Sequence, residues 1–130
     1  MEITDKLVEN GEEKIKVLSI TGEIDLYNAP DFEEVVKKCI YDKVYKIVVN
    51  LDKADYIDSS GINALISSLS NLKKYNGDLF ISNLTNSSMR KIFSLTKVNT
   101  FFCIYWTEDD AVRCIKTGKY DRSDEGVDTL

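Results

Sequence analysis

The feature of the sequence that most constrains the fold is a short apolar run, Ile47-Val48-Val49, between two segments of helical periodicity. The run is β-branched and hardly alternates with polar residues, which is typical of a parallel strand buried on both faces. Apolar residues recur at helical spacing on both sides of it: Phe32, Val35, Val36, Cys39 and Ile40 before, and Ile62, Leu65, Ile66, Leu69 and Leu72 after. Because each amphipathic helix must bury its apolar stripe, this unit predicts an α/β domain.

Further patterns extend this unit into a mixed sheet. Residues 3–8 are expected to form an edge strand, and residues 14–21 alternate apolar and polar side chains for much of their length, which predicts a half-buried strand. Asn10-Gly11 between them is favoured in tight hairpin turns. We expect Gly22 to end the second of these strands. The other segments are expected to form strands at 46–51, 78–82 and 101–105, a loop at 52–57, and helices beginning near Asn28, Asp58, residues 85–88 and Thr107.

The resulting order, β-β-α-β-α-β-α-β-α, predicts one α/β domain. Its mixed β-sheet would carry an N-terminal hairpin and have four helices packed on it. Asn28 is expected to cap the first helix, and Pro30 fits its first turn. The domain is expected to span residues 1–116, followed by a flexible polar tail at 117–130.

The charge of the chain favours protein partners over nucleic acids. It carries 17 basic and 22 acidic residues, a net charge of −5, and no Lys/Arg cluster that would bind a phosphate backbone. It shows neither a signal-peptide pattern nor an apolar run of about 20 residues that could span a membrane. We therefore expect a cytoplasmic protein that binds neither nucleic acid nor membranes, as a monomer or weak dimer.

The absence of histidine narrows the chemistry further. Without histidine, the chain contains no Ser-His-Asp or Cys-His catalytic group, no phosphohistidine relay and no imidazole metal ligand. Cys39, Cys103 and Cys114 are widely spaced and include no C-x-x-C pair, which favours buried free thiols. We expect no metal, no other cofactor and no catalytic residue.

The sequence Asp58-Ser59-Ser60-Gly61 marks the start of the second helix. A helix N-terminus presents unpaired N–H groups and the positive end of the helix dipole, so it receives anions well. A serine at this place can be exposed while its backbone is held in position. Asp and Ser are also the preferred capping residues, so capping alone would explain the motif.

Several segments together resemble the STAS domain of anti-sigma factor antagonists. They are Gly22-Glu23-Ile24-Asp25, residues 29–32, residues 47–51 and, most specifically, the stretch 56–61 that ends in Asp58-Ser59-Ser60-Gly61. The resemblance runs from about residue 15 to residue 115. It implies the STAS fold and the function of an anti-sigma factor antagonist.

In that family the first serine of the motif is phosphorylated by a kinase that is also the anti-sigma factor, which places the role on Ser59. The resemblance implies that the unphosphorylated protein binds this kinase and frees the sigma factor. Once phosphorylated, it would release the kinase until a PP2C-type, metal-dependent phosphatase restores it. The resemblance also implies partner contacts from Asp25 and Asp58, and from Ser60, Gly61 and Asn63. The chain departs from the family at Asn63, where a glycine is common, and this bulkier side chain bears on how closely a kinase approaches.

Three alternatives stay open. One is a STAS scaffold or sensor component in which Ser59 only caps the helix. Another is an enzyme with Ser59 as nucleophile, for which Lys53 is the nearest basic group. The third is an aspartyl-phosphate receiver with Asp55 or Asp58 as acceptor, although a receiver needs a magnesium-binding acidic pair near its first strand and a fully parallel sheet.

Overall fold

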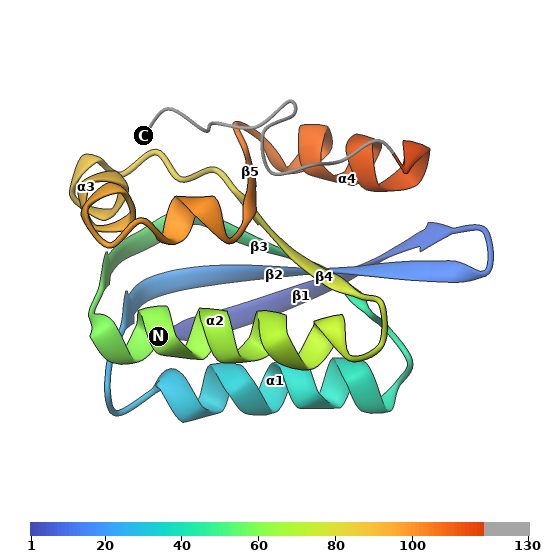
Figure 1. Ribbon diagram of the computed structural model, residues 1–130, viewed down its shortest axis with the longest axis horizontal. Coiled ribbons are helices and arrows are strands. Elements are labelled where there is room, and N and C mark those ends of the chain that lie inside the picture. The colour runs from blue at the N-terminus through green and yellow to red at the C-terminus, as the bar shows by residue number, and fades with distance from the viewer. Residues whose placement is uncertain (119–130) are drawn as a thin grey trace.

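Five strands form one sheet whose spatial order follows the order of the chain, β1-β2-β3-β4-β5. The computed structural model describes residues 1–118 (Figure 1). The strands are β1 (Glu2–Asn10), β2 (Glu13–Ile24), β3 (Lys46–Ile57), β4 (Asp78–Ser82) and β5 (Cys103–Tyr105). The β1–β2 pair is an antiparallel hairpin and every later pair is parallel. The mixed sheet with its N-terminal hairpin is therefore confirmed.

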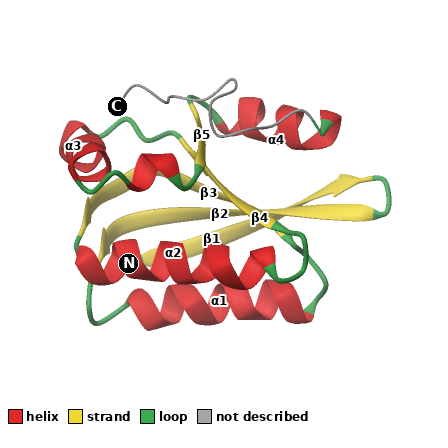
Figure 2. Ribbon diagram, viewed as in Figure 1, coloured by secondary structure: helices red, strands yellow, loops and turns green. Residues whose placement is uncertain are grey.

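Four helices pack on this sheet, as predicted. They are α1 (Ala29–Tyr41), α2 (Ser59–Lys73), α3 (Ser87–Leu95) and α4 (Glu108–Thr117), with a 3-10 turn, η1, at Val98–Thr100. Figure 2 shows α1 and α2 side by side on one side of the sheet and α4 on the other. In residues 1–118, none of the helices has the length and apolar character needed to cross a membrane. Most of the predicted tail, residues 119–130, lies outside the described part of the chain.

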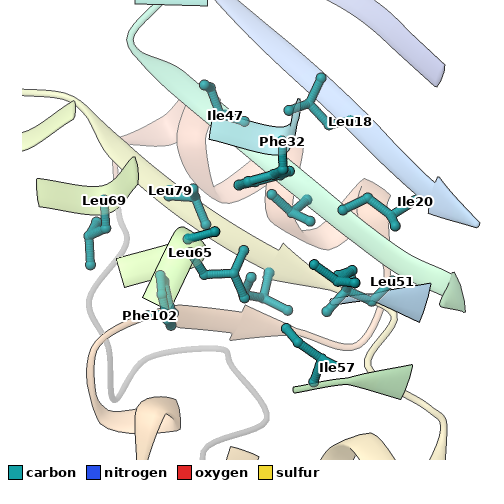
Figure 3. Packing of buried hydrophobic residues seen from close by; sticks show 14 of the residues in the cluster. Leu18, Ile20, Phe32, Ile47, Leu51, Ile57, Leu65, Leu69, Leu79 and Phe102 are labelled. Atoms are coloured by element: carbon teal, nitrogen blue, oxygen red, sulfur yellow. The ribbon is translucent and has the colours of Figure 1, made fainter. Parts of the chain in front are cut away.

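Strand β3 is buried on both faces at residues 47–49 because alternate side chains enter two separate cores. Ile47 and Val49 of β3 join the larger core under α1 and α2, whereas Val48 joins the smaller core under α4. Figure 3 shows the larger core, where Phe32 of α1 and Leu65 of α2 meet the strands. This arrangement confirms the interpretation of the apolar run as a strand buried on both faces.

The strands that lead to the motif are longer than the sequence pattern predicts. The predicted loop at 52–57 is wrong, since these residues continue β3, and Gly22 does not end β2. The ends of β2 and β3 pair with each other, with Glu23 opposite Tyr56, although the register of this pairing shifts twice. Gly22 follows the first of these shifts and has a φ of +92°. The strand β3 therefore carries the chain directly to Asp58.

At the C-terminal side of the sheet the fifth strand is shorter than predicted. The predicted strand at 101–105 is reduced to Cys103–Tyr105, because η1 and the turn after it occupy the preceding residues. Cys103 is buried, as are Cys39 and Cys114, and none of the three forms a disulfide within residues 1–118. Their burial agrees with the interpretation of these residues as core side chains.

Candidate functional site

Ser59 is the first residue of α2 and is exposed at the carboxyl end of β3. The strand ends at Ile57, so one residue separates a buried strand from the helix. In Figure 1 this position lies at the left edge of the molecule, where the connections from β2 to α1 and from β3 to α2 run close together. The serine is thus held on a fixed backbone, with its side chain open to solvent.

Asp58 uses both carboxylate oxygens within the chain. Its Oδ1 accepts hydrogen bonds from the backbone N–H of Ser60 (2.9 Å) and of Gly61 (3.0 Å), which makes it the N-cap of α2. Its Oδ2 accepts a hydrogen bond from the backbone N–H of Leu26 at 3.2 Å. Asp58 therefore links the N-terminus of α2 to the β2–α1 loop, and capping is confirmed as one of its roles.

The β2–α1 loop is closed by Asp25 and Asn28. Asp25 Oδ1 accepts from the backbone N–H of Tyr27 at 3.0 Å and of Asn28 at 3.2 Å. Asn28 Oδ1 accepts in turn from the backbone N–H of Asp25 at 2.8 Å. Asn28 occupies the N-cap position of α1, as predicted, but its side chain makes no capping hydrogen bond to the helix and closes the loop instead.

Gly61, in the first turn of α2, is buried, which corrects its expected role as an exposed contact residue. A Cβ atom at this position would lie 2.5 Å from Ile57 Cγ1 and 2.9 Å from the carbonyl oxygen of Ile24. Glycine is therefore needed because α2 begins in direct contact with the ends of β2 and β3. Ser60 is half-buried, and Asn63 is exposed one helical turn after Ser59.

The structure also places two residues at this edge that the sequence pattern did not single out. Leu26 is 63% exposed and Tyr27 is 89% exposed. Both belong to the loop that Asp58 holds against the start of α2. A signal was present in the sequence: two large apolar residues stand between a strand and a helix and fit the period of neither.

Two of the residues named for the enzyme-like alternatives, Lys53 and Asp55, lie along β3. Lys53 and Asp55 are exposed residues of this strand, and Lys53 is paired in register with Thr21. Among the described residues, no three His, Cys, Asp or Glu side chains are grouped so that they could hold a metal ion. The antiparallel β1–β2 hairpin also departs from the all-parallel sheet that a receiver requires.

Comparison with known proteins agrees with this architecture. The family model described as the STAS domain matches residues 7–111, which include all the site residues described above. The chain belongs to the STAS domain family. In this STAS domain, the site is the edge formed by the β2–α1 loop and the start of α2.

Relatives of this STAS domain include anti-sigma-B factor antagonists of staphylococci. The protein of that name from Staphylococcus aureus is 28% identical over 85 residues, covering 65% of this chain and 78% of the relative. The Staphylococcus epidermidis protein is 27% identical over 79 residues, covering 61% of this chain and 72% of the relative. The similarity therefore extends over most of the relatives' length.

Solved structures show the same fold. An anti-sigma factor antagonist from Mycobacterium paratuberculosis superposes with a TM-score of 0.69 at 25% identity, over 88% of this chain and 95% of that one. A putative anti-sigma factor antagonist from Thermotoga maritima gives a TM-score of 0.76 at 21% identity, over 85% and 92% of the two chains. Unphosphorylated SpoIIAA gives 0.67 at 20% identity, over 88% and 98%.

Substitutions at Asp58 separate its two structural roles. The amide introduced by Asp58→Asn would keep an oxygen for the Ser60 and Gly61 N–H groups but turn its NH2 group toward the Leu26 N–H. This variant should therefore keep the cap and lose the link to the loop. We expect Asp58→Ala to lower the free energy of unfolding by about 1–2 kcal/mol and Asp58→Asn by less than about 1 kcal/mol.

Urea unfolding and amide hydrogen exchange measure these two effects. In Asp58→Asn the Leu26 amide should exchange faster than in wild type, while the Ser60 and Gly61 amides stay protected. In Asp58→Ala all three amides should lose protection. Unchanged exchange at Leu26 in Asp58→Asn would contradict the role of Asp58 in holding the loop.

Proposed function

We propose that this protein is an anti-sigma factor antagonist that exchanges partners through phosphorylation of Ser59. In its unphosphorylated form it binds an anti-sigma factor serine kinase and thereby frees a sigma factor. It acts in the cytoplasm as a binding protein and not as an enzyme. The observation that carries this proposal is the exposed Ser59 hydroxyl at the N-terminus of α2, on a backbone held by Asp58.

The geometry suits a switch that acts at the surface and leaves the fold intact. Phosphorylation would add about −1.5 to −2 charges at neutral pH. The N-terminus of α2 can accommodate this anion, because its N–H groups and the helix dipole favour negative charge. A partner surface that fits a neutral serine beside Asp58 would bind the phosphorylated protein less tightly. The phosphate would be repelled by negative charge in the interface and would lose its hydration there.

Two comparisons support the proposal. The Staphylococcus aureus relative is named for antagonism of the anti-sigma-B factor. The fold is also compatible with phosphorylation, since SpoIIAA of Bacillus has been solved in a phosphorylated form, with a TM-score of 0.63 to this chain at 21% identity. We propose that a PP2C-type phosphatase returns the protein to its unphosphorylated form.

The side chains around Ser59 divide into two groups under this proposal. Ser60 and Asn63 are accessible and would contact the kinase directly, with Asn63 displayed on the same side of α2 as Ser59. Asp25 and Asp58 are half-buried and bonded to backbone N–H groups, so they would act mainly by holding the loop and the helix start. Their negative charge would also add to the repulsion of a phosphate.

The test is phosphorylation by the anti-sigma factor kinase of the host cell, purified and supplied with ATP. We expect one phosphate on wild type, located at Ser59 by mass spectrometry. Ser59→Ala should accept none and should retain the kinase in a pull-down. Ser67→Ala removes an exposed serine farther along α2, outside the proposed contact, so it is the matched control and should be phosphorylated like wild type.

Other outcomes would overturn the switch. Phosphate found on Ser60 would show that Ser60, and not Ser59, is the phosphorylated residue. A Ser59→Ala variant that folds but no longer binds the kinase would make the serine a binding residue. A wild-type protein that is neither bound nor phosphorylated would favour a STAS scaffold that keeps Ser59 as part of a helix start.

A further inference from the structure

The β2–α1 loop displays an apolar pair beside the phosphorylation site. Leu26 and Tyr27 are consecutive, and 63% and 89% of their respective surfaces are exposed. Isolated apolar residues at a surface are ordinary, whereas two consecutive, large and strongly exposed ones place more apolar surface in one loop than is usual. Tyrosine is also enriched among the residues that dominate binding energy at interfaces.

The backbone under this pair is held by hydrogen bonds on both residues. The Leu26 N–H donates to Asp58 Oδ2 at 3.2 Å, and the Tyr27 N–H donates to Asp25 Oδ1 at 3.0 Å. The loop ends are joined by the Asn28 Nδ2 group, which donates to the carbonyl oxygen of Glu23 at 2.9 Å. A loop that is already ordered loses less conformational entropy on binding, so the exposed pair is pre-organised for contact.

The pair lies on the same edge of the molecule as Ser59. Asp58 directly precedes Ser59 and bonds to Leu26, so the loop and the start of α2 are in contact. A protein large enough to cover Ser59 would therefore also cover Leu26 and Tyr27. The two residues therefore belong to the same prospective interface as Ser59.

The two segments of chain that meet at this edge are acidic. Residues 22–36 contain Glu23, Asp25, Asp31, Glu33 and Glu34 but no lysine or arginine. Residues 54–72 likewise contain two acidic residues and no basic one. A complementary partner surface would have an apolar pocket with lysine and arginine at its rim, since such complementarity steers association and excludes wrong partners.

We propose that Leu26 and Tyr27 form the apolar anchor of the partner interface and insert into a basic-rimmed apolar pocket of the anti-sigma factor kinase. The identity of this occupant rests on the function proposed above. The anchor supplies affinity through burial of apolar surface, and Ser59 supplies control through charge. Affinity and regulation are thus carried by different residues on one rigid edge.

The experiment is calorimetric titration of the purified host anti-sigma factor kinase with wild type and four variants. Leu26→Ser and Tyr27→Ser should each raise the Kd roughly 30-fold or more, the effect of losing an anchor residue. Tyr27→Phe keeps the ring and should bind like wild type. Tyr41→Ser is the control for loss of an exposed tyrosine, because Tyr41 is 82% exposed at the opposite end of α1.

The heat capacity change gives a second readout. Wild type should bind with a negative heat capacity change, because binding buries apolar surface, and Tyr27→Ser should reduce its magnitude. Circular dichroism and urea unfolding should be unchanged in all four variants, since these side chains are exposed. Phosphorylation of Ser59 should still weaken the residual binding of Leu26→Ser.

The possible failures are distinguishable. If the kinase binds wild type, Leu26→Ser and Tyr27→Ser with equal Kd, the anchor is refuted while the proposed function stands. If the kinase does not bind wild type, the proposed function is refuted, and the kinase is refuted as the partner of the anchor as well. If sedimentation shows a wild-type dimer that Tyr27→Ser dissociates, the pair joins two copies of this chain and the kinase is the wrong occupant.

Discussion

Replacement of Gly61 by alanine is expected to lower the free energy of unfolding by about 3 kcal/mol. The new Cβ would lie 2.5 Å from Ile57 Cγ1, 2.8 Å from Ile24 Cγ2 and 2.9 Å from the Ile24 carbonyl oxygen. The side-chain atoms could move, but the carbonyl belongs to β2 and is held in the sheet. Relief of the overlap therefore requires α2 to shift away from the strands.

This expected sign is opposite to that for an ordinary helical glycine. At an unobstructed position, exchange of glycine for alanine stabilises a helix by about 1 kcal/mol. Asn63→Ala, at an exposed position in the same helix, is the matched control and should be neutral or slightly stabilising. Urea unfolding measures both variants, and a Gly61→Ala protein as stable as wild type would disprove the close approach of α2.

Phosphorylation of Ser59 is expected to weaken binding of the kinase several-hundred-fold, which corresponds to about 3–4 kcal/mol. In the complex, the phosphate on Ser59 would lose hydrating water to the partner surface. It would also lie close to the negative charge of the half-buried Asp58. Ser59→Asp carries a single negative charge and should lose a smaller part of the affinity, on the order of 10- to 100-fold. Its melting temperature should stay within a few degrees of wild type, because an acidic residue is favourable in the first turn of a helix.

Titration calorimetry of the kinase with wild type, phosphorylated protein and Ser59→Asp measures this effect. Ser67→Asp is the matched control, because Ser67 is exposed two helical turns farther along α2. It should change the Kd much less than Ser59→Asp does. Equal binding of wild type and Ser59→Asp would show that charge at this position is not the switch.

The parts of the fold that could be predicted from sequence were those governed by local periodicity. The apolar side chains at 47–49 point alternately to the two faces of the sheet, so both faces had to be covered. The structure places alternate residues of this run in two cores. Asp58 could be recognised as an N-cap because capping depends on the next three residues alone. The position of the motif at a helix start was therefore accessible from sequence.

The remaining features depend on pairing between distant segments. Residues 52–57 have a loop-like composition, and only their alignment with the end of β2 makes them a strand. The hydrogen bond from the Leu26 N–H to Asp58 joins residues 32 apart in sequence, and no local sequence pattern predicts it. The burial of Gly61 likewise follows from where α2 meets Ile24 and Ile57. These contacts bury Gly61, which the sequence suggested as a contact residue, and give Asp58 a structural role at the start of α2.

The strand order of the sheet has a consequence for biosynthesis. Each strand pairs with the strand that precedes it in the chain, so a nascent chain leaving the ribosome never has to leave a gap for a later strand. The hairpin β1–β2 can form from local contacts alone, and α1, β3 and α2 can then dock in order of synthesis. All residues of the edge that bears Ser59 have been synthesised once residue 73 has emerged. The core under α2 also contains Leu79 and Ile81 of β4, so we expect this edge to become stable only after β4 has been added to the sheet.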